Sequence, residues 1–227
     1  MSTHSITITP DFVWPTPDDN GSRTLANGAV IKPDVAIRQG AVIGPGAVIG
    51  RGAVIGPYAH IGQNAVIKQR AVIEQYAVIE QGAVIGPDVV IGPGARIGQG
   101  AAIEQGAAIE PDVVIGPDVV IGQGVRIGRY ARIGPDAVIE QGAIIGQSAR
   151  IGPNARWIAC VGYADGYYKD LCVVGDVAYI GAGCRWFTLG EALRHWGNHP
   201  EERQDTLDLM QAAVAIAKRR GLKLEEA

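Results

Sequence analysis

Long apolar runs, closely spaced cysteines and an excess of one charge are all missing from this sequence of 227 residues. No segment approaches the roughly 18 to 20 apolar residues that a membrane span requires, and the first residues lack the basic-then-apolar order of a signal peptide. The formal net charge is only -3, with acidic and basic residues interspersed, so no polyanion-binding surface is indicated. We therefore expect a cytoplasmic protein that binds neither membrane nor nucleic acid.

Cysteine is scarce as well. Cys160, Cys172 and Cys184 stand twelve residues apart in the last third of the chain, an odd number without a CxxC pair. This spacing does not suit a disulfide framework or a zinc site. We expect reduced thiols in a core, and no metal or other cofactor.

The abundant feature of the sequence is a six-residue repeat. An aliphatic residue recurs every six positions from Leu25 to Ile151, which gives 22 hexads without an insertion, and 21 of these anchors are isoleucine. Ala or Val follows four residues after each anchor without exception. A stripe of period six cannot stay on one face of a helix with 3.6 residues per turn. The repeat therefore excludes an α-solenoid.

Each hexad also carries a turn signal three residues after its anchor. Gly, Asp or Asn usually stands there, and these residues tolerate a positive φ best. The exceptions are Tyr58, Arg70, Tyr76, Tyr130 and Ser148. β-branched residues precede each corner, which is typical of short strands whose anchors point inward and whose immediate neighbours point outward. Stacked coils would bury every anchor and pair each strand with its equivalents above and below.

The motif Ile-Gly-Pro-Gly-Ala-Val and its close variants, from Leu25 to Arg156, resemble the hexapeptide-repeat proteins. This resemblance implies a left-handed parallel β-helix, a triangular solenoid with three hexads in each coil. The hexads then form about seven coils, roughly 35 Å long at about 4.8 Å per layer. Such uniform hexads also resemble a consensus design, and we expect an engineered repeat with flanks from a natural protein.

The flanks differ in composition from the repeat. Residues 1–24 combine a strand-like run with bulky aromatics and predict an N-terminal cap segment, whereas residues 25–156 form the β-helix. Residues 157–227 lose the register and predict a small antiparallel sheet followed by two helices, the first opened by a Thr188–Glu191 capping box. The fold class is therefore mostly β, with a small C-terminal α+β module that caps the solenoid.

His60 is the one histidine within the coils. The resemblance implies an acyltransferase alternative, because many members of the family act as trimers with a histidine base at the subunit interface and a coenzyme A thioester as donor. His60 directly precedes an anchor, so its side chain should point outward, where it could serve as a base. No acidic residue or inserted loop accompanies it, which favours an incidental histidine.

Other activities within the family are disfavoured by what the coils lack. Members that resemble γ-class carbonic anhydrases need three histidines around a metal, and His195 and His199 lie far away in the helical tail. Ice-binding β-helices present ranks of Thr-x-Thr, but no threonine occurs between Ala26 and Arg156. We expect neither a metal site nor ice binding.

Outward positions directly before the anchors, taken at every third hexad, sort the coils into faces. One face carries an apolar ladder, formed by Val30, Val48, Val66, Val84, Ala102, Val120 and Val138. An exposed apolar ladder on a flat sheet predicts an association surface, although Val also simply favours strands. The positions after the anchors on this face carry charges that reverse about Gly86, with Lys32 and Lys68 before it and Glu104 and Glu140 after it.

This charge reversal predicts how two copies would pair. An antiparallel two-fold arrangement places Lys32 opposite Glu140 and Lys68 opposite Glu104, as a self-complementary interface requires. We expect an antiparallel homodimer, with the family's parallel trimer as the alternative. With so little chemical variety in the hexads, the sequence favours a structural scaffold that associates through this face and catalyses nothing, and a hexapeptide-repeat acyltransferase is the alternative.

Overall fold

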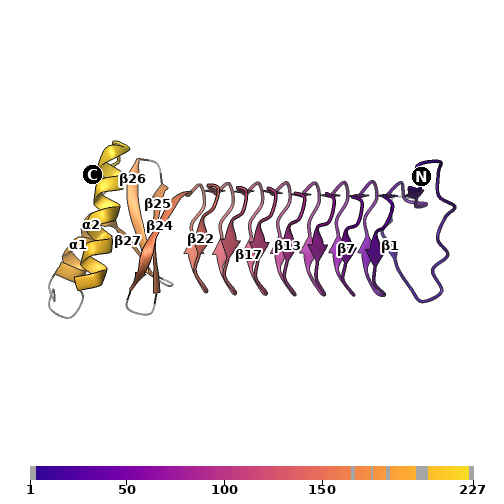
Figure 1. The fold of residues 1–227 in the computed structure, drawn as a ribbon, viewed down its shortest axis with the longest axis horizontal. Coiled ribbons are helices and arrows are strands. Elements are labelled where there is room, and N and C mark those ends of the chain that lie inside the picture. The colour runs from indigo at the N-terminus through magenta and orange to yellow at the C-terminus, as the bar shows by residue number, and fades with distance from the viewer. Residues whose placement is uncertain (1–3, 165–166, 175, 183–184, 198–203, 225–227) are drawn as a thin grey trace.

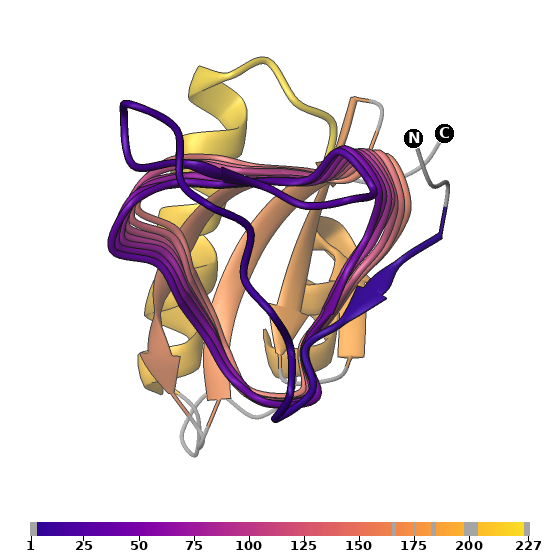
Figure 2. The ribbon, with the colours of Figure 1, turned by 90° about the vertical axis from the view of Figure 1, so that its right-hand side faces the viewer.

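The chain folds as a straight solenoid with a second, smaller layer at its C-terminal end. The computed structural model describes residues 4–164, 167–174, 176–182, 185–197 and 204–224. Figure 1 shows the N-terminal chain at one end of the coils, and a sheet followed by two helices at the other. Viewed along the axis, the coils superimpose on a triangle (Figure 2). The predicted β-solenoid of about seven turns, with three parallel sheets, is confirmed.

The three flat sides of the triangle are three sheets, named A, B and C. Sheet A consists of β1 (Ile6–Thr7), β5 (Val42–Ile43), β8 (His60–Ile61), β11 (Val78–Ile79), β14 (Arg96–Ile97), β17 (Val114–Ile115), β20 (Arg132–Ile133) and β23 (Arg150–Ile151). Sheet C consists of β4 (Ala36–Ile37), β7 (Val54–Ile55), β10 (Val72–Ile73), β13 (Val90–Ile91), β16 (Ala108–Ile109), β19 (Arg126–Ile127) and β22 (Ile144–Ile145).

Sheet B is the longest, because it continues beyond the coils. Its order is β2 (Arg23–Thr24), β3 (Val30–Ile31), β6 (Val48–Ile49), β9 (Val66–Ile67), β12 (Val84–Ile85), β15 (Ala102–Ile103), β18 (Val120–Ile121), β21 (Val138–Ile139), β24 (Arg156–Ala164), β25 (Tyr167–Val174), β26 (Val177–Ala182) and β27 (Arg185–Thr188). β24 pairs parallel with β21, and the strands after it form an antiparallel meander.

The register stacks equivalent residues of successive coils on each other. Ile79, for example, lies between Ile61 and Ile97, each 18 residues away. The anchors and the small residues four positions later fill the interior, and all are buried except Val35 and Ile37 of the first coil. Burial of one large and one small apolar residue in each hexad therefore holds the coils together.

The corners adopt the conformation that the turn signal predicts. The residue three positions after every anchor has a positive φ, including the five that are neither Gly, Asp nor Asn, with φ of 58° at Tyr58, 56° at Arg70, 58° at Tyr76, 63° at Tyr130 and 59° at Ser148. A left-handed conformation costs a non-glycine residue about 1–2 kcal/mol. The repeat therefore imposes its geometry even where the local sequence opposes it.

The C-terminal layer packs on the last coils through one face of its sheet. Cys172 and Tyr179 pack against the solenoid core, whereas Leu171 and Ile180 on the opposite face pack against the helices. The helices are α1 (Leu189–Gly197) and α2 (Gln204–Arg219). Neither of these two described helices is long and apolar enough to cross a membrane.

The predicted capping box opens α1. The Thr188 backbone N–H donates to Glu191 Oε2 at 2.8 Å, and the Glu191 N–H donates to Thr188 Oγ1 at 3.2 Å. The hydrogen bond from the Thr188 backbone is the main reason that the pKa of the Glu191 carboxyl is lowered. From the sequence, Pro200 is expected to open the second helix. Pro200 lies outside the described residues, which show this helix from Gln204.

Candidate functional site

His60 lies in β8, near the N-terminal end of sheet A. Its backbone N–H donates to the Ala77 carbonyl at 2.9 Å, and in register it lies between Val42 and Val78. Both valines are half-buried, whereas the imidazole is exposed. Alternation within the strand turns the buried Ile61 inward and His60 outward, as the sequence predicted. A ligand lying on sheet A could therefore reach the imidazole from solvent.

Two tyrosines border this position at the corner between sheets C and A. Tyr58 and Tyr76 occupy the same corner of successive coils, and their rings stack with centroids 5.4 Å apart and planes at 6°. Both rings remain more than half exposed, at 55% and 58%. The sequence singled them out only as unusual corner residues. Each coil is 18 residues long, so Tyr76 lies over Tyr58, which precedes His60 by two residues. The two rings together form an exposed aromatic surface at this corner.

Arginines continue the same face toward the C-terminal end. Arg96, Arg132 and Arg150 are exposed on sheet A, and Arg132 lies directly beside Arg150 in register. Like charges in neighbouring strands destabilise a sheet unless an anion lies between them. Within the part of the chain that the structure describes, none of the three forms an ion pair. Sheet A therefore combines one possible base with a row of cations.

The carboxylate nearest in sequence on this face belongs to Glu80, and it is already engaged. Glu80 Oε2 accepts a hydrogen bond from the Gln99 backbone N–H at 3.2 Å. No described carboxylate forms an ion pair with His60. Any proton transfer by His60 would therefore depend on the imidazole alone and on the substrate that it contacts.

Sheet B carries the apolar ladder in register. Each Val or Ala pairs with its equivalent in the next coil, from Val30 to Val138. These side chains are half-buried, except that Val120 is 39% exposed. Lys32, Lys68 and Glu104 are exposed, but Glu140 lies 3.6 Å from Arg220 of the same chain. The seven residues thus lie in register on one face, but six of them are half-buried rather than exposed, and one of the four charges has an intramolecular partner.

An ion pair that the sequence did not predict joins two corners at the edge between sheets B and C. Arg70 Nε and Nη2 donate to the two carboxylate oxygens of Asp88 at 2.6 and 2.9 Å. The hydrogen bond from Arg70 is the main cause of the lowered pKa of the Asp88 carboxyl, and Asp88 likewise raises the pKa of Arg70. An exposed pair of this kind contributes little stability.

The described residues hold no group of three His, Cys, Asp or Glu side chains that could bind a metal ion. Cys172 is buried at the solenoid end, whereas the side chain of Cys160 and all of Cys184 lie outside the described part. His195 stacks on Phe187 and contacts Trp196, which places it in the packing of α1. His199 is not among the described residues.

The coils match a known family model, described as bacterial transferase hexapeptide (six repeats), over residues 28–63, 64–99, 94–129 and 124–156. Together these matches cover more than half of the chain. This finding overturns the interpretation as a structural scaffold without catalysis, which is wrong. Chemical uniformity of the hexads misled that interpretation, because a transferase solenoid needs only a few distinctive side chains on an otherwise regular face.

Several solved structures have a similar fold. UDP-N-acetylglucosamine O-acyltransferase from Moraxella catarrhalis is 16% identical, with 57% of this chain and 68% of that chain covered and a TM-score of 0.42. The acetyltransferase domain of PglB from Neisseria gonorrhoeae, in complex with acetyl coenzyme A, is 20% identical, with 56% and 49% covered and a TM-score of 0.32. This chain thus spans about half of that second structure. A comparison with curated proteins found no match.

Proposed function

Because this chain belongs to the bacterial transferase hexapeptide family, whose fold is a left-handed β-helix, we propose that it is an acyltransferase with a coenzyme A thioester as donor. The observation that carries the proposal is that its one solenoid histidine, His60, is exposed on the same flat sheet as Arg96 and Arg132. A base and cations on one face suit a long donor with a reactive end and a phosphate end.

The spacing along sheet A supports this placement of the donor. Arg96 lies two coils beyond His60 and Arg132 four coils beyond it, which correspond to about 10 and 19 Å at the usual strand spacing. A donor lying parallel to the solenoid axis would place its thioester at His60 and its phosphates along the arginines. Guanidinium groups bind phosphate oxygens through paired hydrogen bonds, which also relieves the repulsion between neighbouring cations.

The proposed reaction needs one proton carrier. The His60 imidazole takes the proton from a hydroxyl or amino group of the acceptor while that oxygen or nitrogen attacks the thioester carbonyl. Collapse of the tetrahedral intermediate breaks the carbon–sulfur bond, and the imidazolium returns the proton to the departing thiolate. The acceptor is acylated, free coenzyme A leaves, and the histidine ends neutral.

Replacing His60 by alanine is expected to lower turnover by about 10²–10⁴-fold, the usual contribution of a general base. Release of free thiol from acetyl-CoA and longer acyl-CoA donors, in the presence of amine and hydroxyl acceptors, measures turnover. Donor binding, measured by calorimetry, should change little in this variant. The absence of binding at millimolar donor would rule out the proposed function, as would unchanged turnover in His60→Ala.

One arginine on sheet A and one on sheet C allow a matched comparison of donor binding. Arg132→Gln on sheet A should weaken binding of the donor about 10- to 100-fold, because a charge-assisted contact to phosphate contributes about 1.5–3 kcal/mol. Arg126→Gln on sheet C removes an exposed arginine of the neighbouring hexad and should leave binding unchanged. Equal effects of the two changes would show that the donor does not lie along sheet A.

Sheet B remains our proposed surface for self-association, through Val30, Val48, Val66, Val84, Ala102, Val120 and Val138. We expect Val66→Lys with Val84→Lys to yield monomers, because two buried charges would oppose an apolar interface. Light scattering distinguishes the forms, since chains of 23.8 kDa give about 48 kDa for the antiparallel dimer and about 71 kDa for a trimer. A trimer would contradict the pairing of Lys32 with Glu140, and Glu140 already has Arg220 as a competing partner.

Two further expectations from the sequence stay predictions. One is the consensus-designed origin of the repeat, which rests on the uniformity of its hexads. The other is the division into a cap segment 1–24, a β-helix 25–156 and a C-terminal module 157–227. Limited proteolysis tests this division, because cleavage should concentrate at boundaries where few contacts cross.

A further inference from the structure

The N-terminal end of the solenoid is covered on only two of its three sides. β1 pairs antiparallel with β5 on sheet A, and β2 pairs antiparallel with β3 on sheet B. Sheet C instead begins at β4, and no described strand covers its outer edge. An open edge of this kind presents backbone groups to which another extended chain can add.

The missing strand leaves identifiable groups without partners. On sheet A, the Ile8 N–H donates to the Ala41 carbonyl, and on sheet B the Leu25 N–H donates to the Ala29 carbonyl, both at 2.8 Å. The carbonyl at the equivalent position of sheet C belongs to Val35, and it accepts no hydrogen bond from any residue that the structure describes. A third antiparallel strand would complete this pattern.

The missing strand also leaves the core uncovered at this side. Ile8 and Leu25 each place a buried aliphatic side chain over the first coil, at 5% and 3% exposure. Among the described residues, no strand places an aliphatic side chain over sheet C in the same way. Phe12 packs against the core, but Ile37 is still the one anchor of the repeat that stays half-buried. An added strand with an aliphatic residue facing inward would bury this surface.

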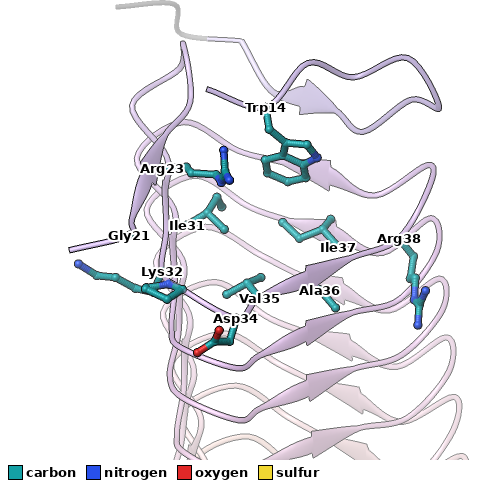
Figure 3. Close-up of a pocket in the computed structure, with 11 residues that line it drawn as sticks. Trp14, Gly21, Arg23, Ile31, Lys32, Asp34, Val35, Ala36, Ile37 and Arg38 are labelled. Carbon is teal, nitrogen blue, oxygen red and sulfur yellow. The ribbon is translucent and has the colours of Figure 1, made fainter. Parts of the chain in front are cut away.

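A pocket of about 560 Å³ opens above β4. Figure 3 shows the Trp14 indole above Ile37, with the Arg23 guanidinium beside it over Ile31. Arg23 is half-buried and is oriented by a hydrogen bond from its Nη1 to the Pro15 carbonyl. An indole and a guanidinium thus form the outer wall of the space that a third strand would occupy.

The charges around this pocket favour an acidic ligand. Arg23 lines it, and Lys32 and Arg38 flank β4 on its two sides in the sequence. The acidic residue that lines the pocket, Asp34, is paired with Arg51 at 3.0 Å. The three cations that line the pocket have no described ion-pair partner, whereas its one carboxylate is neutralised. The cations would attract acidic residues at either end of a short strand.

The shape of this end excludes a broad partner. Figure 1 shows the N-terminal chain extending beyond the first coil, so the flat end of a second solenoid cannot approach β4 closely. An extended peptide needs only the single open edge that β4 presents. Addition of a strand to an open sheet edge is a common mode of peptide recognition.

We propose that the outer edge of β4 binds an extended peptide in which an aliphatic residue is flanked by acidic residues, paired antiparallel as the third cap strand. Its backbone N–H donates to the Val35 carbonyl, its aliphatic side chain covers Ile37 beneath Trp14, and its carboxylates reach Arg23, Lys32 and Arg38. This site is independent of the transferase reaction proposed for sheet A.

The test uses the full chain and a labelled, capped peptide, acetyl-Glu-Thr-Ile-Thr-Glu-amide, with binding followed by fluorescence anisotropy. N-methylation of the central isoleucine removes its N–H and should weaken binding at least tenfold. Replacing both glutamates by lysine should weaken it by a similar factor. Binding should also change the emission of Trp14, and this change should disappear in Trp14→Phe.

Protein variants separate this site from a general electrostatic effect. Arg23→Glu and Lys32→Glu should each weaken binding about tenfold, whereas Arg126→Glu, a distant exposed position on the same sheet, should not. Lys32 is exposed, so its variant should fold even if Arg23→Glu does not. Equal affinity for the N-methylated and parent peptides would overturn the proposal. So would self-association that Arg38→Glu abolishes without peptide binding, because Arg38 lines this pocket and lies outside the proposed sheet B interface, and a second copy would then occupy the edge.

Discussion

Replacing Ile85 by alanine is expected to lower the free energy of unfolding by about 2–5 kcal/mol, the range for a buried aliphatic residue truncated to Ala. Ile85 lies in a middle coil at 0% exposure, and its side chain stacks between Ile67 and Ile103. The cavity therefore opens where neighbouring coils cannot close it. Because each coil contacts only its neighbours, the loss also weakens the coupling between the two halves of the solenoid.

Val84→Ala is the matched control for this change, and urea denaturation monitored by circular dichroism measures both variants. Val84 directly precedes Ile85 but is half-buried on the outer surface of sheet B, so its truncation should cost well under half as much. If Val84→Ala lowered the free energy of unfolding as much as Ile85→Ala does, the outward orientation of Val84 in a monomer would be contradicted. If the loss depended on protein concentration, it would indicate that a second copy covers Val84.

Removing residues 157–227 is expected to add end-to-end association of the coils to the self-association proposed for sheet B. β24 pairs with β21, and Cys172 and Tyr179 pack against the solenoid core. Truncation after Arg156 would expose the last coil and the unpaired edges of its strands. Bare edges of parallel strands pair with other chains, so aggregates or end-to-end oligomers should form.

Light scattering and sedimentation of the truncated and full chains test this expectation. Glu191→Ala in the full chain is the control, because it removes the side-chain acceptor of the α1 capping box without uncovering the coils. This variant should lose a little stability, about 0.5–2 kcal/mol for a cap, and keep the mass of the parent. A truncated chain with the same mass and melting temperature as the full chain would show that the C-terminal layer is not needed as a cap.

The coils could be predicted closely from the sequence because each hexad makes the same local demands. The anchors, the small inward residues and the positive φ at Tyr58 and Ser148 all follow from position within the hexad. Ile37 is different. Its partial exposure depends on where residues 4–24 cross the end of the solenoid, and no local pattern in those residues indicates that sheet C stays uncovered.

The candidate site was only partly predictable. The outward direction of His60 follows from its place before an anchor, and the alignment of Arg96 and Arg132 follows from the 18-residue coil. The interpretation of the coils as a scaffold was wrong, because the uniform hexads were taken to indicate that no chemistry takes place on them. The roles of His60 and the arginines on sheet A stay predictions. Stacking of Tyr58 on Tyr76 is likewise a contact between coils, 18 residues apart.

Local sequence specifies the repeat, its inward and outward positions, its corners and the capping box at Thr188, because each depends on residues within a few positions of one another. Contacts between distant segments specify which sides of the solenoid are capped, the ion pair of Glu140 with Arg220, and the position of Trp14 and Arg23 over the open edge of β4. These features join segments far apart in the chain. Their geometry depends on the paths of the irregular ends, which no periodic pattern specifies.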